Sequence, residues 1–502
     1  MVKARTWPVM AVVVAMGLSL LGAAGARAAQ AGTIQAGTTK PVGAAGESAP
    51  FLIVSDMHFN PLDDASLAAR LDAAPAKDWP AILDGVAGRR LSPFGRDSNW
   101  FVLRSALNAM RQAQPHPAYI LHTGDMLAHD FRDTFEAALP AHKGDEVAYR
   151  AFTLKTVTTL LEALRRTFPG VPVLTALGNN DSYCGDYAVE PNGLFLGDTL
   201  PLLTRGFGRP LIGRADQDGI GRDWRQAGNY VVPHPTLKGV RILSFDTVML
   251  TRKYKNSCGR PDDTPQDTTL TWLHQALADA KAAGDSVWLI THVVPGVDGF
   301  ATANNWSKAA KAAAAAGQPI PACTAPVELF APGMEARFEA ELAQYYDIIK
   351  VLFAGHIHMD DLRLVGPPGA GVPVLVTPAV SPVYQQSPSF KLGQAATDGS
   401  ISHLTTYYLN NLSDHPSVKT ARWVPEYDTA QAWGAKSLTP DTLRAVIAHI
   451  RDSGPARALY RSIYSVARPQ ASAMIPDNQA LYLCALDNTL VDAYTRCACP
   501  AP

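Results

Sequence analysis

The feature that most constrains the fold is an apolar run, Leu352-Phe353-Ala354-Gly355, which stops at two histidines, His356 and His358, separated by one residue. Two imidazoles at that spacing, at the end of a buried strand, can clamp a metal ion. Four other strand-like runs also end in metal-binding residues: 51–54 before Asp56 and His58, 119–121 before Asp125, 171–177 before Asn179, Asn180 and Asp181, and 287–290 before His292. The recurrence indicates one site built from five strand ends.

Each of these residues alone has an ordinary explanation. A histidine beside an apolar run is usually a core residue bonded to backbone, and Gly-Asp is a common turn pair. The ordered set of Asp-x-His, Gly-Asp, Gly-Asn-x-Asp, a lone His and Gly-His-x-His is not expected by chance. It mixes imidazole nitrogens with hard oxygens, which suits zinc, with manganese and iron as alternatives, rather than calcium.

The ligands are too many for one tetrahedral ion and suit two divalent ions that share a carboxylate. The candidate ligands are Asp56, His58, Asp125, Asn179, His292, His356 and His358. Two ions roughly 3.5–4 Å apart can hold a hydroxide between them and grip both oxygens of an in-line phosphoryl displacement. We therefore expect a phosphoesterase.

Strand-like runs alternate with amphipathic helical patterns, which predicts an α/β domain. The helical patterns lie at 99–113, 147–166, 268–283 and 334–345. Ligands at the carboxyl ends of strands are what open α/β sheets favour. An alanine run at 308–316 is either low-complexity sequence or an exposed helix or flap. Helical patterns at 439–451 and 456–466 predict a small helical C-terminal subdomain over 421–502, with a cysteine-bearing tail.

The N-terminus has the pattern of a signal peptide over residues 1–28. Lys3 and Arg5 precede an apolar run at 7–21, and Ala26-Arg27-Ala28 fits a signal peptidase site. The apolar run falls short of the roughly 20 residues of a membrane-spanning helix, and no later segment is apolar enough to span. Residues 29–48 are expected to form a flexible leader and 49–420 the catalytic domain, in a secreted or periplasmic protein.

The charge balance argues against some partners. With 44 Lys plus Arg against 45 Asp plus Glu, the net charge of −1 gives no overall positive field to hold nucleic acid. We expect a small-molecule or polymeric phosphate substrate and no stable nucleic-acid partner. The sequence does not predict the oligomeric state.

The cysteine count fits an exported chain. Six cysteines are present, at positions 184, 258, 323, 484, 497 and 499. An even number in an oxidising compartment predicts disulfides, but six allow 15 pairings. A bond from Cys484 to Cys497 or Cys499 would tie down the C-terminus, and no Cys-x-x-Cys supports a thiolate zinc site.

The five motifs, in this order from Asp56 to His358, resemble those of the calcineurin-like metallophosphoesterases. The resemblance implies a four-layer α/β/β/α sandwich with a two-metal site at its strand ends. It implies that Asp125 bridges the ions and that a metal-bridging hydroxide attacks phosphorus directly. One ion would be held by Asp56, His58, Asp125 and one of the pair His356 and His358, and the second by Asp125, Asn179, His292 and the other histidine of that pair.

Finer similarity points to the acid sphingomyelinase-like phosphodiesterases. Segment 122–130 resembles their second motif, in which the histidine four residues beyond the bridging Asp, here His129, is a proton donor. Asp130 or a backbone carbonyl is expected to orient its imidazole. Segment 93–98 is similar to their Gly-x-Cys-Asp-Ser-Pro segment, and similarity continues through 381–390, 407–410 and 423–434.

Two departures from that branch shape the prediction. Asn180 stands where most relatives have a histidine that contacts phosphate, and an amide cannot carry a proton, so acid catalysis shifts to His129. Some polyphosphatase-like members share this Asn. The chain also has no N-terminal six-cysteine saposin-like domain, which favours a water-soluble phosphodiester or phosphoanhydride, such as a nucleotide, polyphosphate or head-group diester. The alternatives are a phosphomonoesterase and a catalytically weakened metal-binding protein of the same fold.

Overall fold

The structure is a computed structural model that describes residues 48–255, 265–367, 369–472 and 474–499. The predicted signal peptide, all but the last residue of the predicted leader, and Cys258 lie outside the described residues.

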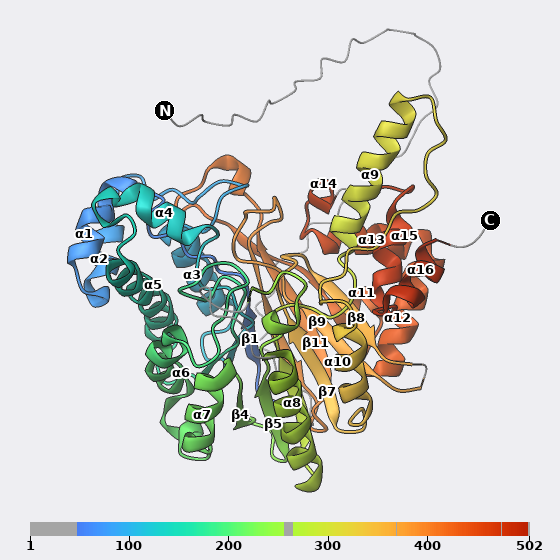
Figure 1. Cartoon of the computed structure of the whole chain (residues 1–502), viewed down its shortest axis with the longest axis horizontal. Coiled ribbons are helices and arrows are strands. Elements are labelled where there is room, and N and C mark those ends of the chain that lie inside the picture. The colour runs from blue at the N-terminus through green and yellow to red at the C-terminus, as the bar shows by residue number, and fades with distance from the viewer. Residues whose placement is uncertain (1–47, 256–264, 368, 473, 500–502) are drawn as a thin grey trace. The chain divides into compact units, whose positions relative to one another are not determined.

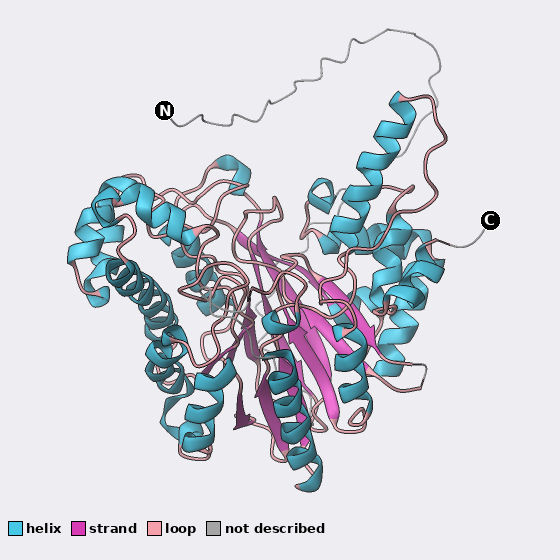
Figure 2. Cartoon of the chain, viewed as in Figure 1, coloured by secondary structure: helices cyan, strands magenta, loops and turns pink. Residues whose placement is uncertain are grey.

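Two six-stranded sheets form the centre of the described chain, and helices cover their outer faces (Figures 1 and 2). The first sheet has the order β12-β11-β10-β1-β2-β3 and the second β4-β5-β6-β7-β9-β8. Phe51 and Tyr119 of the first sheet contact Trp288 of the second, with ring centroids 5.4 and 6.4 Å apart, so the sheets face each other across an aromatic core. The predicted α/β fold with two central sheets is confirmed.

The strands are β1 Phe51–Val54, β2 Ile120–His122, β3 Val173–Thr175, β4 Tyr230–Pro233, β5 Val240–Ser244, β6 Ser286–Ile290, β7 Ile349–Ala354, β8 Asp361–Val365, β9 Val372–Val376, β10 Ser389–Ala395, β11 Ile401–Leu409 and β12 Trp423–Asp428. In the first sheet β1, β2 and β3 are parallel, with Val54 level with His122 and His122 with Thr175. In the second sheet β6 and β7 are parallel, with Ile290 level with Phe353. Parallel strands in register end together, so the five motifs start from one edge of the sheets.

Four helices lie where the sequence patterns predict them: α3 Trp100–Ala113, α5 Glu146–Thr167, α8 Pro265–Ala282 and α10 Met334–Ala343. Side-chain caps fix where α3 and α5 begin. The Asn99 carboxamide accepts hydrogen bonds from the next N–H groups of α3, and the Asp145 carboxylate does the same for α5.

Other helices were not all anticipated. The alanine run lies in α9 Gly299–Ala315, which therefore is a helix, and it follows the loop after β6. The sequence patterns did not predict two helices, α6 Leu194–Ile212 and α7 Gln217–Ala227. The helical pattern of α6 is interrupted by Pro201, Pro210 and a non-helical Gly208. The remaining helices are α1 Ala68–Ala73, α2 Trp79–Asp84, α4 Phe131–Ala138, α11 Thr429–Trp433, α12 Pro440–Asp452, α13 Gly454–Tyr464, α14 Pro469–Ser472, α15 Gln479–Leu483 and α16 Val491–Ala498.

The C-terminal region begins as a strand. β12 pairs antiparallel with β11, with Trp423 opposite Leu409, so the first sheet takes its edge strand from the region predicted to be helical. The helices α11–α16 follow, and the division near residue 420 stays a prediction. Disulfides join Cys323 to Cys499 and Cys484 to Cys497, and Cys184 is also disulfide-bonded, which confirms that disulfides form. Within the described residues, no helix has both the length and the apolar content needed to cross a membrane.

Candidate active site

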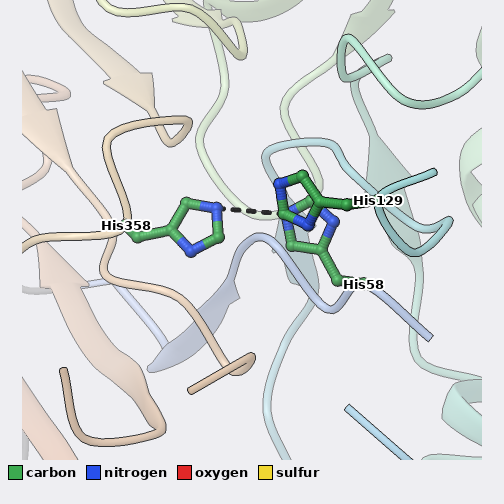
Figure 3. A group of neighbouring side chains, drawn as sticks. All are labelled: His58, His129 and His358. Atoms are coloured by element: carbon green, nitrogen blue, oxygen red, sulfur yellow. Dashed lines mark hydrogen bonds between the residues drawn. The ribbon is translucent and has the colours of Figure 1, made fainter. Parts of the chain in front are cut away.

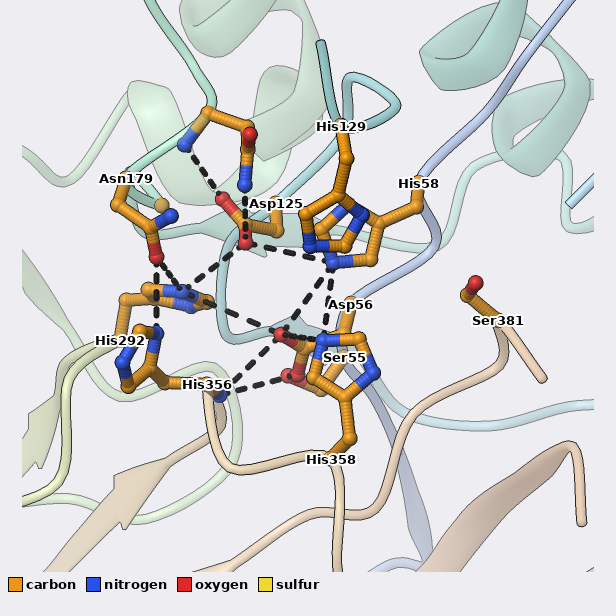
Figure 4. A network of polar contacts seen from close by, with 12 residues as sticks. Ser55, Asp56, His58, Asp125, His129, Asn179, His292, His356, His358 and Ser381 are labelled. Atoms are coloured by element: carbon orange, nitrogen blue, oxygen red, sulfur yellow. Dashed lines mark hydrogen bonds and ion pairs between the residues drawn. The ribbon is translucent and has the colours of Figure 1, made fainter. Parts of the chain in front are cut away.

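All seven predicted ligands converge at the common edge of the two sheets (Figure 4). Asp56 and His58 follow β1, Asp125 follows β2, Asn179 follows β3, His292 follows β6, and His356 and His358 follow β7. The first sheet thus supplies four of these side chains and the second sheet three. The site lies across the two sheets rather than within one of them.

Asp125 lies at the centre of the cluster. Its Oδ2 atom is 3.4 Å from His58 Nε2 and 3.3 Å from His292 Nε2, although these histidines come from different sheets. The Asn180 side-chain amide and main-chain N–H donate to the two oxygens of Asp125, at 2.9 and 2.8 Å. One carboxylate therefore reaches both halves of the site.

The first half of the site joins His58 and His358 to Asp56. The Nε2 atoms of His58 and His358 are 3.1 Å apart, and His358 Nε2 is 3.4 Å from Asp56 Oδ1 (Figure 3). Asp56 is held from both sheets, because Ser55 Oγ and the main-chain N–H of His356 donate to its carboxylate. The second sheet thus orients a ligand of the first.

The second half is arranged around Asn179. Its Oδ1 atom is 3.0 Å from His292 Nε2 and 2.8 Å from His356 Nδ1, and its amide donates to Asp186 Oδ1 at 2.6 Å. His356 Nε2 lies 3.0 Å from the Tyr187 hydroxyl. Of the two histidines of the last motif, His358 lies with His58, and His356 contacts the Asn179 oxygen that also faces His292.

The backbone of these loops is unusual. Five of the seven residues have positive φ: Asp56 at 47°, His58 at 39°, Asp125 at 60°, His356 at 71° and His358 at 63°. Residues other than glycine rarely adopt positive φ values, and such conformations cluster at functional sites. The motif glycines are close-approach positions, since a Cβ at Gly178 would collide with the Asp125 carboxylate and one at Gly355 with Ser55 Oγ.

The hydrogen bonds behind the cluster show that it fits cations. His58 Nδ1 donates to the carbonyl of Leu127 at 2.9 Å and His292 Nδ1 to that of Thr123 at 2.7 Å. Because Nδ1 carries the donated proton, Nε2 of each neutral ring is an acceptor and points its lone pair at the Asp125 carboxylate. Two acceptors can face each other in this way only if a proton or a metal ion lies between them. Imidazole nitrogens and carboxylate and amide oxygens that face one another in this way are a donor set for divalent metals.

Without metal, protons take that role. Burial opposes a charged imidazole, but the surrounding carboxylates, Asp125 foremost and Asp56 with it, outweigh burial and raise the pKa of His58 to about 10 and that of His292 to about 9. Burial also opposes the charge on Asp125, yet these two histidines hold its pKa well below the usual value. His356 and His358, in contrast, have their pKa lowered by burial, so they remain neutral and able to coordinate.

His129, the predicted proton donor, lies at the rim of the first half. Its ring stacks on His58 with centroids 4.1 Å apart (Figure 3). Its Nδ1 donates to Asp97 Oδ1 at 3.0 Å and its main-chain N–H to Asp97 Oδ2 at 2.9 Å. Its Nε2 lies on the site side, 3.5 Å from the hydroxyl of Tyr384.

The partner of His129 is therefore Asp97, not the expected Asp130 or a backbone carbonyl. Asp97 also accepts from Ser381 Oγ at 3.3 Å. Burial opposes its ionisation, but the hydrogen bond from His129 lowers its pKa below the ordinary value. Asp97 belongs to the 93–98 segment that the sequence singles out, but only the fold brings it to His129.

Two further residues, Asp181 and Tyr384, lie in segments that the sequence singles out but are not among the candidate ligands or catalytic residues. Asp181 accepts main-chain hydrogen bonds from Asp125, Met126 and Gly178 at 2.8–3.0 Å, and so joins the second and third motifs. Burial and the charge of Asp125 raise its pKa to about 7. Tyr384 packs edge-on against His358, with centroids 4.6 Å apart, while its side chain remains exposed. Asp181 follows Asn179 and Asn180 in the same motif, and Tyr384 lies in the 381–390 segment, where the similarity marks the segment but not this residue.

The chain is similar to several known proteins. A family model described as calcineurin-like phosphoesterase matches residues 49–360. The chain is 24% identical over 473 residues to the acid sphingomyelinase-like phosphodiesterase 3b of Homo sapiens, covering 91% of each chain. It is 22% identical over 469 residues to the cyclic GMP-AMP phosphodiesterase of Mus musculus, covering 89% of this chain and 91% of the relative. A solved structure, a dimetal phosphatase from Danio rerio, is similar with a TM-score of 0.37 and 12% identity, covering 76% of this chain and 99% of that one.

Proposed function

Because the chain belongs to the calcineurin-like phosphoesterase family, within its acid sphingomyelinase-like phosphodiesterase branch, we propose that it is an exported enzyme that hydrolyses a water-soluble phosphodiester or phosphoanhydride. Family membership makes it a metal-dependent phosphoester hydrolase. Export, the substrate and the roles of individual residues are our proposal.

The metal ligands in this proposal follow the two halves of the cluster. Asp56, His58, Asp125 and His358 would hold one divalent ion, and Asp125, Asn179, His292 and His356 would hold the other. The observation that carries this assignment is the position of the Asp125 Oδ2 atom, within 3.4 Å of Nε2 atoms that belong to different sheets. A site rich in imidazole favours zinc, with manganese and iron as alternatives.

Bound ions would supply charge for the phosphoryl oxygens and lower the pKa of water toward neutrality. The residues of the chain provide the orientation. Asp125 is fixed by two donors from Asn180 and by the rigid turn that Asp181 closes. The second N–H of the Asn180 amide is free to donate to a phosphoryl oxygen. The Asn180 amide can stabilise charge on the phosphoryl oxygens as the usual histidine does, but it cannot donate a proton to the leaving group.

His129 protonates the departing oxygen. Its Nδ1 is committed to Asp97, so the imidazolium form can release only the Nε2 proton, which lies on the site side. Asp97 accepts from His129 and holds its ring face to face with that of His58, with 20° between the two ring planes. Asp97 is a positioning residue, and His129 is the general acid.

The substrate class rests on what surrounds the site. Tyr187 and Tyr384 lie beside the cluster, and Lys253 Nζ is 4.9 Å from the ring centre of Tyr187. An aromatic ring can stack on a base, and a cation can bind a further phosphate. Because one relative is named a cyclic GMP-AMP phosphodiesterase, cyclic dinucleotides join nucleotides, polyphosphate and choline phosphodiesters as substrates to test.

The test is hydrolysis of bis(nitrophenyl) phosphate by the purified, metal-stripped protein with zinc or manganese added back. We expect turnover that requires metal, is lost to a chelator, and exceeds the rate on nitrophenyl phosphate. Asp125→Asn should lose both bound ions and activity together. A faster rate on the monoester would instead support the phosphomonoesterase alternative. Metal binding without turnover on any substrate would support the weakened binding protein.

Export has a separate test. The mature protein, recovered from outside the cytoplasm, should begin at Ala29 by N-terminal sequencing, because cleavage is expected after Ala28. Full-length protein retained inside the cell would contradict this part of the proposal and leave the chemistry untouched.

A further inference from the structure

A buried arginine links the two loops that carry the histidines of the second sheet. Arg363 lies on β8 and is 1% exposed. Its Nε donates to Asp361 Oδ2 at 3.1 Å, and its Nη1 donates to the carbonyl oxygen of Pro295 at 2.8 Å. Asp361 lies three residues beyond His358, and Pro295 lies three residues beyond His292. Arg363 and Asp361 both lie on β8, which begins directly after the loop that carries His356 and His358, so one guanidinium ties the start of β8 to the loop after β6.

The C-terminal helices complete this link. The hydroxyl of Tyr460, on α13, donates to Asp361 Oδ1 at 2.8 Å, so both oxygens of that carboxylate are bound. The carbonyl of Tyr464 accepts the main-chain N–H of Asp360 at 2.9 Å. Asp361 and Tyr460 are 5% and 2% exposed, and charged groups this deep are stable only when their partners are in place.

The loop after β6 has no room to move away from Arg363. Gly296 has a φ of 102°, and its main-chain N–H donates to Glu335 Oε2 at 2.8 Å. A Cβ at Gly296 would lie 3.3 Å from Arg363 Nη1 and 3.1 Å from the Thr489 side chain. The loop is therefore closed on one side by α10 and on the other by the arginine.

From these contacts we infer that Arg363, oriented by Asp361 and Tyr460, is a positioning residue that sets the distance between His292 and the His356–His358 pair. It touches neither a ligand nor the substrate, so its effect reaches the site only through the two loops. The C-terminal helix α13 is in this way part of the metal-binding apparatus. The inference rests on the proposal that the seven side chains bind metal ions.

The test compares zinc affinity with folding stability in three variants of the full-length protein. Arg363→Lys keeps the charge but cannot reach both partners, and Tyr460→Phe removes one hydrogen bond from Asp361 without a cavity. Tyr494→Phe is the matched control, because its buried hydroxyl donates to the carbonyl of Leu481 at 2.7 Å, a contact that is not part of the link. Zinc dissociation constants come from competition with a chromophoric chelator, and stability comes from thermal unfolding of the metal-free proteins.

We expect Arg363→Lys to weaken zinc binding roughly 10–100-fold and Tyr460→Phe up to about tenfold, as for other residues that orient metal ligands. Tyr494→Phe should lower the unfolding temperature as much as Tyr460→Phe and leave zinc affinity unchanged. Excess zinc should restore kcat in Tyr460→Phe. Equal zinc affinity in Tyr460→Phe and Tyr494→Phe would overturn the inference, even if Arg363→Lys fails to fold. Wild-type protein that binds neither zinc, manganese nor iron would overturn the proposed function as well.

Discussion

Replacing the general acid should have an effect that depends on the leaving group. An alkoxide is a strong base and needs a proton as it departs, whereas a nitrophenolate leaves without one. General acid catalysis supplies roughly 10²–10⁴ in rate. We expect His129→Ala to lose about that factor on a substrate with an alcohol leaving group and less than about tenfold on bis(nitrophenyl) phosphate.

The structure also predicts how much rate should be lost when Asp97, the partner of His129, is replaced. Asp97 accepts two hydrogen bonds from His129, and a bond between charged partners is worth about 1.5–3 kcal/mol. The His129 side chain is 27% exposed, so solvent screening favours the lower end of that range. Asp97→Asn should therefore cost about tenfold on the alcohol substrate, since about 1.4 kcal/mol is a factor of ten.

The assay is single-turnover hydrolysis of the two substrates at equal metal content, with zinc measured on each sample. His274→Ala is the control, because His274 lies on the surface of α8 and pairs with Glu341. Equal losses on both substrates in His129→Ala would refute the acid role. His129 would then act by supporting His58, on which its ring stacks.

Three further predictions concern the scaffold. Gly178→Ala should displace the Asp125 carboxylate and weaken metal binding at least tenfold, measured by chelator competition; unchanged affinity would show that the loop has room to shift. Burial raises the pKa of Glu335 from 4.5 to about 8, so between these pH values the folded protein keeps a proton that the unfolded chain releases. The stability that this protonated carboxyl contributes is full below pH 4.5 and is lost as the pH rises to about 8. Denaturant titrations at several pH values should show that the unfolding free energy of Glu335→Gln falls less than that of the wild type over that range. Equal pH dependence of the two proteins would contradict this prediction. Cys484→Ser should lower the unfolding free energy by about 3 kcal/mol, because its bond to Cys497 closes a loop of 13 residues, and an unchanged unfolding midpoint would argue against a stabilising bond.

The sequence predicts most of the site because each ligand follows a strand. The run before His356 and the run before Asp56 are buried on both faces, so their ends are visible as the points where apolar residues stop. In a parallel sheet these ends share one edge. Residues that directly follow successive strands can therefore be predicted from the sequence to lie close together. The α/β class follows from the alternation of strand and helix patterns, whereas the two central sheets are implied by the resemblance to the calcineurin-like metallophosphoesterases.

What escaped prediction depends on contacts between distant segments. Asp97 reaches His129 across 32 positions, while Asp130 is adjacent in sequence but points elsewhere. Lys391 would argue against a buried strand, yet it lies inside β10 because its ammonium binds the Asp360 carboxylate at 2.6 Å. Spacing rules carry no information about such pairs, since each partner has an ordinary sequence neighbourhood.

The separation of the ligands along the chain has a consequence for when the enzyme matures. His58 and His358 lie 300 residues apart, and β1 is flanked by β10 on one side. At roughly 5–20 residues per second, about 15–60 s pass between synthesis of the first histidine and the last. No early fragment on the ribosome can hold the paired ions, so activity is withheld until translation is nearly done. On the proposed export route, the cation that fills the site is then drawn from the compartment where the final strands fold, so local supply acts together with the preference of the donor set in selecting it.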